Sequence, residues 1–280
     1  MTFKTVLVCL TTEPAAEQIM PAACAISRAF GAHLIGIHTL AAIVPYPGIA
    51  LHIDHPQYKI FNDQAAAQSA RIEAVFQAQV AQEDFSAEYH TISAQSTHAS
   101  DQLVQTAFRS DLVIASQPDP EHERYDQLGS QKDLIVNSGR PVLLIPPAYE
   151  GNGIGNRILL AWNATRESAA AAQGALPFMT RAEETIVLTV SAEQPHSISG
   201  DTEGHEVAKT LARHGVQPTV RHVSQIEASV GDQILAEAKA NTCDLIVMGA
   251  FGHSRLHSFF FGDATRFMLE KADLPVLFAS

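Results

Sequence analysis

A glycine-rich stretch in the last part of the chain has the residue types and spacing of an anion-binding loop. The apolar run 244–248 (DLIVM) leads directly into Gly249, and Gly252 and Gly262 follow before a helical pattern over 265–271. Such a run is typical of a strand buried on both faces of a parallel sheet. A loop between that strand and a helix presents backbone N–H groups and a positive dipole end, which favour an anion such as phosphate. A tight turn that binds nothing is the alternative explanation of the glycines.

Two better-known phosphate motifs do not fit the chain. The segment 151–155 (GNGIG) lacks the G-x-G-x-x-G spacing and precedes a predicted strand instead of following one, so we interpret it as a linker. The pattern G-x-x-x-x-G-K-[ST] does not occur, which excludes a P-loop with its phosphate-binding lysine. The loop that begins at Gly249 is therefore the main candidate for a phosphate site.

Histidines are numerous, but their spacing does not complete a metal site. His52, Asp54 and His55 lie close together in the sequence, and His253 and His257 have the i, i+4 spacing of a helix face. A structural zinc site needs four ligands in a recognisable spacing, and neither group supplies them. We therefore expect no metal site built from protein residues alone.

The composition indicates an ordinary globular protein and disfavours polyanionic partners. The 280 residues are 46% hydrophobic and 17% charged, which is enough chain for one or two domains with real cores. The formal net charge is −12 and no cluster of Lys and Arg occurs, so we expect no nucleic-acid partner and no membrane partner. The first residues lack a signal-peptide pattern, and the three cysteines share no C-x-x-C spacing. These features predict a cytoplasmic protein.

Strand and helix patterns alternate along the chain, which is typical of an α/β fold with a parallel sheet. Pro21 should kink the first helix or split off its first turn, Gly31 should end that helix, and 41–56 is predicted to be an inserted loop. Strands are predicted over 4–10, 33–39, 88–93, 111–116, 141–145, 157–162, 185–190, 218–223, 244–248 and 275–279. Helices are predicted over 13–30, 57–82, 100–109, 126–137, 165–180, 203–214, 230–240 and 265–271.

The second half repeats the first in sequence as well as in pattern. We therefore predict two similar doubly wound α/β domains, 1–147 and 155–280. Ligands in such sheets bind at the carboxyl ends of the strands, where the strand order reverses, so Asn163 and Gly249 are expected to face one crevice. The matching segments are 110–114 (SDLVI) with 243–247 (CDLIV), and 139–144 (GRPVLL) with 273–278 (DLPVLF).

The spacing Gly249-x2-Gly252-x9-Gly262, after DLIVMG and before a helix and a PVL strand, resembles the nucleotide loop of the universal stress proteins. Two copies would make the chain the tandem type of that family. The resemblance implies an adenine-nucleotide alpha-hydrolase-like fold with a five-stranded parallel sheet flanked by helices in each domain. It also implies that the two domains pair through their fifth strands, and that some members bind ATP or another adenine nucleotide. Many members are stress-induced cytoplasmic proteins without established catalysis.

The resemblance also implies which residues would bind the nucleotide. Gly249 and Gly252 would approach the phosphates through their backbone N–H groups, and His253 and Ser254 could donate side-chain hydrogen bonds. The backbone of Val190 matches the position that contacts adenine. The complete set carried over is Asn163, Val190, Met248, Gly249, Gly252, His253, Ser254, Gly262, Asp263, Ala264 and Thr265.

Two residues of this set depart from the family pattern. Asp263 stands where ATP-binding members have Ser or Thr, which removes a donor, adds like-charge repulsion and would weaken binding about ten- to a hundredfold. A bound Mg²⁺ or Mn²⁺ would reverse this loss by bridging the carboxylate to phosphate oxygens. Asn163 replaces an Asp, and an amide cannot act as a general base.

The first half has lost the loop. Gln117-Pro118-Asp119-Pro120 follows the fourth strand without a glycine pair, although Gly129-Ser130 and Gly139 remain. We predict one working site at most, in the second half, and a non-catalytic binding protein that responds to an adenine nucleotide. The alternatives are a nucleotide-free structural or regulatory interaction protein and, third, a slow ATPase that would have to use Asp263. A homodimer formed through exposed sheet edges is a further expectation.

Overall fold

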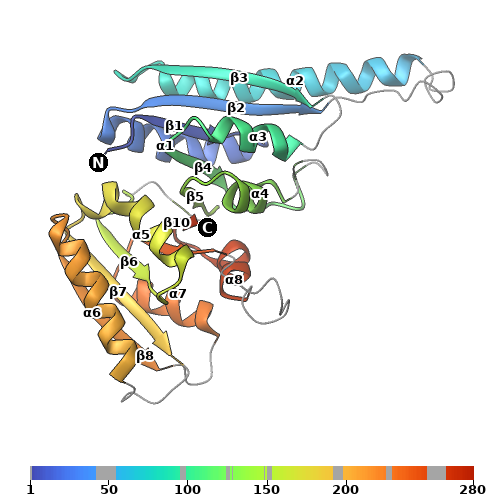
Figure 1. The fold of residues 1–280 in the computed structure, drawn as a ribbon. Coiled ribbons are helices and arrows are strands. Elements are labelled where there is room, and N and C mark those ends of the chain that lie inside the picture. Colours follow the sequence, from blue (N-terminus) through green and yellow to red (C-terminus); the bar gives the residue numbers. More distant parts are fainter. Residues whose placement is uncertain are drawn as a thin grey trace. The chain divides into compact units, whose positions relative to one another are not determined.

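The computed structural model describes residues 2–41, 55–94, 99–123, 127, 129–147, 149, 153–191, 198–224, 229–250 and 263–280. Strands and helices alternate along them, as predicted (Figure 1). The first half contains β1 (Thr5–Cys9), α1 (Glu13–Phe30), β2 (His33–Ala41), α2 (His55–Val80), β3 (Ala87–Ala94), α3 (Ala99–Ala107), β4 (Leu112–Ser116), α4 (Ser130–Asn137) and β5 (Val142–Ile145). The second half contains β6 (Arg157–Ala161), α5 (Arg166–Met179), β7 (Glu184–Ser191), α6 (Ile198–Arg213), β8 (Pro218–Ser224), α7 (Val230–Ala240), β9 (Leu245–Gly249), α8 (Asp263–Lys271) and β10 (Val276–Ala279).

The chain forms two compact units, Lys4–Ser138 and Gly139–Ser280, and the second also includes residues 1–3. The first unit has the strand order β3-β2-β1-β4 with parallel neighbours. The second has the order β5-β10-β9-β6-β7-β8, in which β10 to β8 run parallel and β5 is antiparallel to β10. The boundary between the two compact units lies before β5. The predicted domains, 1–147 and 155–280, were defined by the sequence repeat instead, and they stay a prediction.

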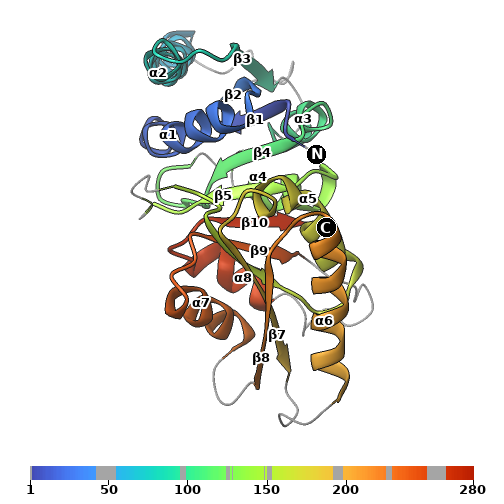
Figure 2. The ribbon, with the colours of Figure 1, turned by 90° about the vertical axis from the view of Figure 1, so that its left-hand side faces the viewer.

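Helices cover both faces of the strands in each unit, which is why the central strands are apolar. In the second unit, Figure 2 shows α6 on one side of the strands and α7 on the other. In the first unit, α1 and α3 lie on opposite sides of the sheet (Figure 2). The central residues of β1, β4, β6 and β9 are buried at every position, as expected for parallel strands between two helical layers.

In each half, an aspartate before the fourth strand accepts hydrogen bonds from the backbone at the start of the first strand. Asp244 accepts hydrogen bonds from the backbone N–H groups of Gly155, Asn156 and Arg157 at 3.0–3.1 Å, and from the Asn156 amide at 2.9 Å. In the first half, Asp111 accepts the corresponding backbone bonds, from Lys4 at 2.7 Å and Thr5 at 3.0 Å. The repeated Asp-Leu segment therefore aligns equivalent strands in the two halves.

Several predicted boundaries are wrong by a few residues. α1 is one helix from Glu13 to Phe30 with Pro21 inside it, and no first turn is split off; Gly31 ends it in a left-handed conformation, with φ of 59°. α4 begins at Ser130, four residues later than predicted, and α6 begins at Ile198, five residues earlier. The predicted inserted loop 41–56 loses its ends to β2 and α2, and 42–54 lies outside the described residues.

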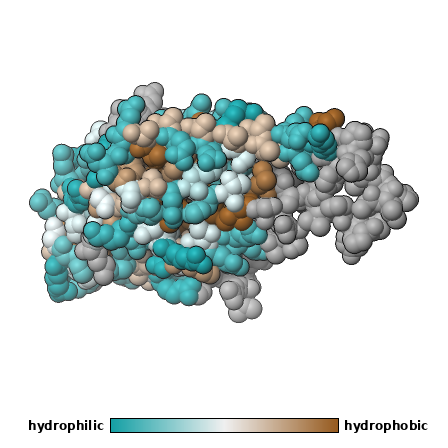
Figure 3. All heavy atoms as spheres, turned by 90° about the horizontal axis from the view of Figure 1, so that it is seen from above, coloured by the Kyte–Doolittle hydropathy of each residue, from teal (hydrophilic) through white to brown (hydrophobic). Residues whose placement is uncertain are grey.

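The described surface carries single exposed apolar side chains. Ile60, Phe108 and Val136 are the large exposed ones among the described residues. Figure 3 shows one face of the molecule, on which hydrophilic residues predominate and hydrophobic residues are interspersed. Exposed apolar residues of this kind are normal for a protein surface in water. None of the described helices is long and apolar enough to cross a membrane.

Candidate nucleotide-binding site

The candidate site begins where the strand order of the second unit reverses. From β6 the chain adds β7 and β8 on one side, while β9 and β10 lie on the other side of β6. Ala161 at the end of β6 is paired with Met248 of β9, so the two strands end side by side. Asn163 and Gly249 therefore follow neighbouring strands at the same edge of the sheet. This is the edge at which doubly wound sheets bind ligands.

Asn163 is held by the start of α5. Its side chain is exposed, and its amide oxygen accepts a hydrogen bond from the Thr165 hydroxyl at 2.8 Å. Thr165 also caps α5, because its Oγ1 accepts from the backbone N–H of Ser168 while the Ser168 hydroxyl accepts from the backbone of Thr165. The cap fixes the Asn163 oxygen as an acceptor, and the side chain at this position is a neutral amide that carries no charge.

Gly249 has a structural reason to be glycine that the sequence did not reveal. A Cβ atom at this position would lie 2.5 Å from the backbone nitrogen of Ser168 and 2.6 Å from the carbonyl carbon of Glu167. The first turn of α5 therefore packs directly on the backbone at the end of β9. The absent side chain permits this approach whether or not a ligand is bound, so the residue type alone does not indicate phosphate.

Past Gly249 the structure describes the two ends of the loop. Ala250 is buried and its backbone N–H donates to the carbonyl of Ala279 at 2.8 Å. Gly252, His253, Ser254 and Gly262 lie outside the described residues, so their predicted roles stay predictions.

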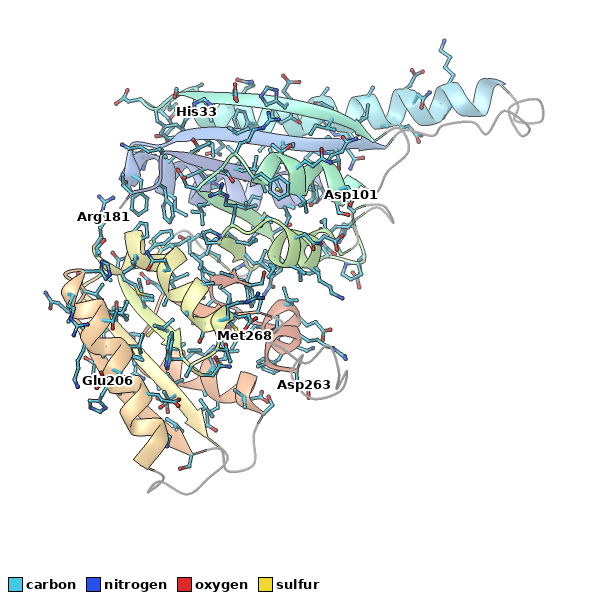
Figure 4. All side chains as sticks on the ribbon, viewed as in Figure 1. His33, Asp101, Arg181, Glu206, Asp263 and Met268 are labelled. Carbon is cyan, nitrogen blue, oxygen red and sulfur yellow. The ribbon has the colours of Figure 1, made fainter. Side chains whose placement is uncertain are left out.

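The description resumes at α8, whose first residue is Asp263. The Asp263 side chain is exposed, whereas Thr265 is buried with 3% of its surface accessible. Figure 4 labels Asp263 at the start of α8 and Met268 further along the helix. Of these first-turn side chains, the carboxylate of Asp263 is the exposed one, and Ala264 between them is half-buried. A ligand at the helix start would therefore meet a negative charge before a hydroxyl.

The two remaining members of the predicted set come from the strands on either side of β6. Val190 is half-buried near the end of β7, where it is paired with Val223 of β8. β7 is the second strand from β9, with β6 between them. Met248 is buried, with 5% of its surface accessible. Val190 could offer a ligand its backbone, while the Met248 side chain belongs to the core.

The described residues give no support for a metal site. No group of three or more His, Cys, Asp or Glu side chains in this part of the chain could hold a metal ion. His52, Asp54, His253 and His257 lie outside it, and nothing is described of the His55 side chain.

The cysteines behave as small core residues. Burial raises the pKa of Cys9 to about 12 and that of Cys243 to about 11. Both thiols are therefore protonated at neutral pH, and neither is an activated nucleophile.

Comparison with known proteins gives matches to the second half and to the fold of the whole chain. Residues 155–280 match the model of the Universal stress protein family. A universal stress protein from Archaeoglobus fulgidus DSM 4304 matches at 13% identity and a TM-score of 0.69, over 98% of this chain and 96% of its own. A functionally unknown protein from Pseudomonas aeruginosa PAO1 matches at 17% identity and a TM-score of 0.58, over 99% and 92%. The full length therefore has the two-domain fold of a tandem universal stress protein. The match to the universal stress protein family itself covers residues 155–280, the second half of the chain.

One similar solved structure contains a nucleotide. It is a universal stress protein from Archaeoglobus fulgidus in complex with dAMP, 14% identical, covering 51% of this chain and 98% of its own at a TM-score of 0.33. Among curated proteins, no relative matches the chain.

Proposed function

We propose that the second half binds an adenine nucleotide, with ATP as the first candidate, and that the protein is a stress-related cytoplasmic binding protein. The observation that carries the proposal is the reversal of strand order between β6 and β9, which brings Asn163 and the start of the glycine loop to one edge. The spacing of Gly249, Gly252 and Gly262 supports a phosphate as the group bound there.

Asp263 makes the proposed binding dependent on a divalent cation. Its exposed carboxylate lies in the first turn of α8, where the helix dipole favours a negative group and where a phosphate would otherwise be attracted. A carboxylate beside a phosphate is a common pair of ligands for Mg²⁺, which keeps its remaining positions filled with water. The proposed ligand is accordingly the magnesium complex of the nucleotide.

The same residues favour binding over catalysis. Hydrolysis of the phosphoanhydride bond of ATP needs a positioned general base or a metal-activated water. Asn163 cannot take a proton, which leaves Asp263 as the candidate for a slow ATPase. We propose a non-catalytic role, and the experiment below distinguishes binding of ATP from its hydrolysis.

A nucleotide-free interaction protein is the second candidate. Gly249 is required by the packing of α5, and Asp263 places a charge that repels phosphate, so both residues are explained without a nucleotide. β3 and β8 are edge strands. A second copy of the chain or another partner could pair with such an open edge.

The experiment is to denature the purified protein and assay the supernatant for adenine nucleotide, with and without added Mg²⁺. Adenine nucleotide close to one per chain, and a higher melting temperature on adding Mg-ATP, are the expected results. Asp263→Ser should strengthen binding without Mg²⁺ about ten- to a hundredfold. Asp84→Ser, which removes an exposed charge in the first half, is the matched control and should change nothing.

The outcomes separate the candidate functions. Absence of nucleotide in both conditions, together with no thermal shift, would favour the interaction protein. Gly252→Val should abolish binding and leave the fold intact, and an unchanged affinity would refute the loop assignment. If ATP is hydrolysed and Asp263→Ser stops the turnover, the protein is an ATPase.

A further inference from the structure

Trp162, the single tryptophan of the chain, stands between the end of β6 and Asn163. Its side chain is half-buried. The indole nitrogen, Nε1, is itself buried, and no acceptor in the described part of the chain takes its hydrogen. An indole N–H can only donate, and a buried one usually has a partner. An acceptor from outside the described residues would remove the cost of burying this donor.

The sheet pairing places the Trp162 side chain on the same face as Gly249. Ala161, the last residue of β6, is opposite Leu188 of β7 and Met248 of β9. The backbone N–H of Trp162 donates to the carbonyl of Leu188 at 2.8 Å, so the ladder between β6 and β7 continues by one residue. One step beyond the paired residues, Trp162 is level with Gly249, and side chains at the same level of a parallel sheet point to the same face.

The start of α5 covers this face. A Cβ atom on Gly249 would meet the backbone of Glu167 and Ser168, which belong to the first turn of α5. Trp162 is therefore on the face where α5 begins, at the carboxyl edge of the sheet. Doubly wound sheets bind their ligands at this edge.

The strand order indicates which part of a nucleotide would reach Trp162. The glycine loop, with the proposed phosphate position, begins at the end of β9, and Val190, the predicted adenine contact, is near the end of β7. β6 lies between these two strands. A nucleotide that extends from the loop to Val190 crosses the end of β6, so its nucleoside part is the part beside Trp162.

The first half shows that the fold does not require an indole at this position. Leu10 is the equivalent residue, because its backbone N–H donates to the carbonyl of Ile37 at 2.8 Å in the same way. The Leu10 side chain is buried, with 2% of its surface accessible. An apolar side chain is therefore enough for packing. The donor occurs in the half that carries the glycine loop, and leucine occurs in the half that has lost it.

We propose that Trp162 is a ligand-binding residue whose indole N–H donates to the nucleoside part of the bound nucleotide. This role rests on the proposed nucleotide-binding function of the second half. The acceptors that a nucleoside offers are the ring nitrogens of adenine and the oxygens of the ribose. Binding gives the buried donor a partner, and this contributes to the affinity.

The first test is the fluorescence of the full chain, which reports on Trp162 because the chain has no other tryptophan. Adenosine, ATP with Mg²⁺ and tripolyphosphate with Mg²⁺ are titrated separately. Adenosine and ATP should shift the emission of Trp162 and reduce its quenching by acrylamide, whereas tripolyphosphate should change neither. An equal shift with tripolyphosphate would overturn the assignment of Trp162 to the nucleoside.

The second test is Trp162→Phe, which keeps an aromatic ring and removes the donor. Calorimetric titration should show an affinity for ATP and for adenosine about five- to tenfold lower, with that for tripolyphosphate unchanged. Phe178→Leu, at the other end of α5, thins the core of the same unit and should leave all three affinities unchanged. An ATP affinity equal to that of wild type in a folded Trp162→Phe protein would overturn the proposal. If this variant does not fold, the fluorescence of the wild type decides.

The failure of this role and the failure of the proposed function give different results. If neither adenosine nor Mg-ATP raises the melting temperature of the wild type, both are refuted. If Mg-ATP raises the melting temperature while the emission of Trp162 stays the same, the role of Trp162 alone is refuted.

Discussion

Asp244 shows how a single carboxylate can fix a strand, because its four hydrogen bonds hold the residues that begin β6. Asp244→Ala would leave these backbone N–H groups without their acceptor. We expect the free energy of unfolding to fall by about 3 kcal/mol, the order found when hydrogen bonds to a charged group are removed. Asp111→Ala removes two such bonds in the first half and should cost less. Urea denaturation of both variants measures the difference, and equal costs would contradict this explanation.

At Gly249 the prediction concerns packing. Gly249→Ala would place a carbon atom 2.5 Å from the backbone of α5, and a backbone cannot move away as a flexible side chain can. We expect a loss of about 1–3 kcal/mol in stability, as for other overpacked positions. Gly174→Ala in α5 is the control, because its Cβ would meet the Pro141 side chain at 3.0 Å and it gains helix propensity. A Gly249→Ala protein as stable as wild type in thermal unfolding would refute the close approach.

Single residues were the hardest level to predict from sequence. The pattern around Gly249 predicted a phosphate loop, which stays a prediction. The contact of Gly249 with Ser168 of α5 joins positions 81 residues apart (249 − 168) and leaves no local signal. The buried indole nitrogen of Trp162 had no signal either, because its burial and its acceptors depend on the packing around the ring. Thr265 is a predicted site residue whose side chain is buried, and burial depends on tertiary packing that a single residue type does not reveal.

At the scale of elements, the start of α5 links the fold to the candidate site. Thr165→Ala removes the helix cap and the bond to the Asn163 oxygen together, so we expect a loss of about 1 kcal/mol in stability. Thr165→Ser keeps both hydroxyl bonds and should lose only a few tenths. If the site binds nucleotide, the alanine variant should also bind it more weakly than the serine variant. Chemical denaturation and an ATP titration of the two variants provide the comparison, and identical behaviour would contradict the cap.

Elements with strong terminal signals were predicted to the residue. α1 begins after Thr12, whose side chain caps it, and ends at Gly31; α7 begins after the capping Ser229. The predicted starts of α4 and α6 were wrong because glycines near each start gave misleading local signals. Gly129 adopts a left-handed φ of 82° and ends the turn before α4, while α6 continues through Gly200 despite the low helix propensity of glycine.

At the scale of the whole molecule, the predicted pairing of the two fifth strands is confirmed. β5 and β10 are antiparallel, with Leu143 opposite Leu277, and both side chains are fully buried. Leu277→Asp would bury a charge in this pairing, and we expect a loss above about 3 kcal/mol. Leu143→Asp should have a similar effect because it faces the same neighbours. Thermal unfolding tests both variants. The control is Leu269→Asp, at a half-buried position on α8. A markedly smaller effect at one of the two leucines would contradict a shared pairing.

The pairing of β5 with β10 also sets an order of events during synthesis. Residues 146–275 separate β5 from β10 in the chain, so β10 leaves the ribosome roughly 10 s after β5 at typical elongation rates. During that interval the edge of β5 that will pair with β10 is open, and its four residues, which are buried in the complete fold, are apolar. Such an edge attracts other strands, and two ribosomes on one message would bring identical edges close together. Slow translation of the second half should therefore promote misassembly between neighbouring nascent chains more than slow translation of the first.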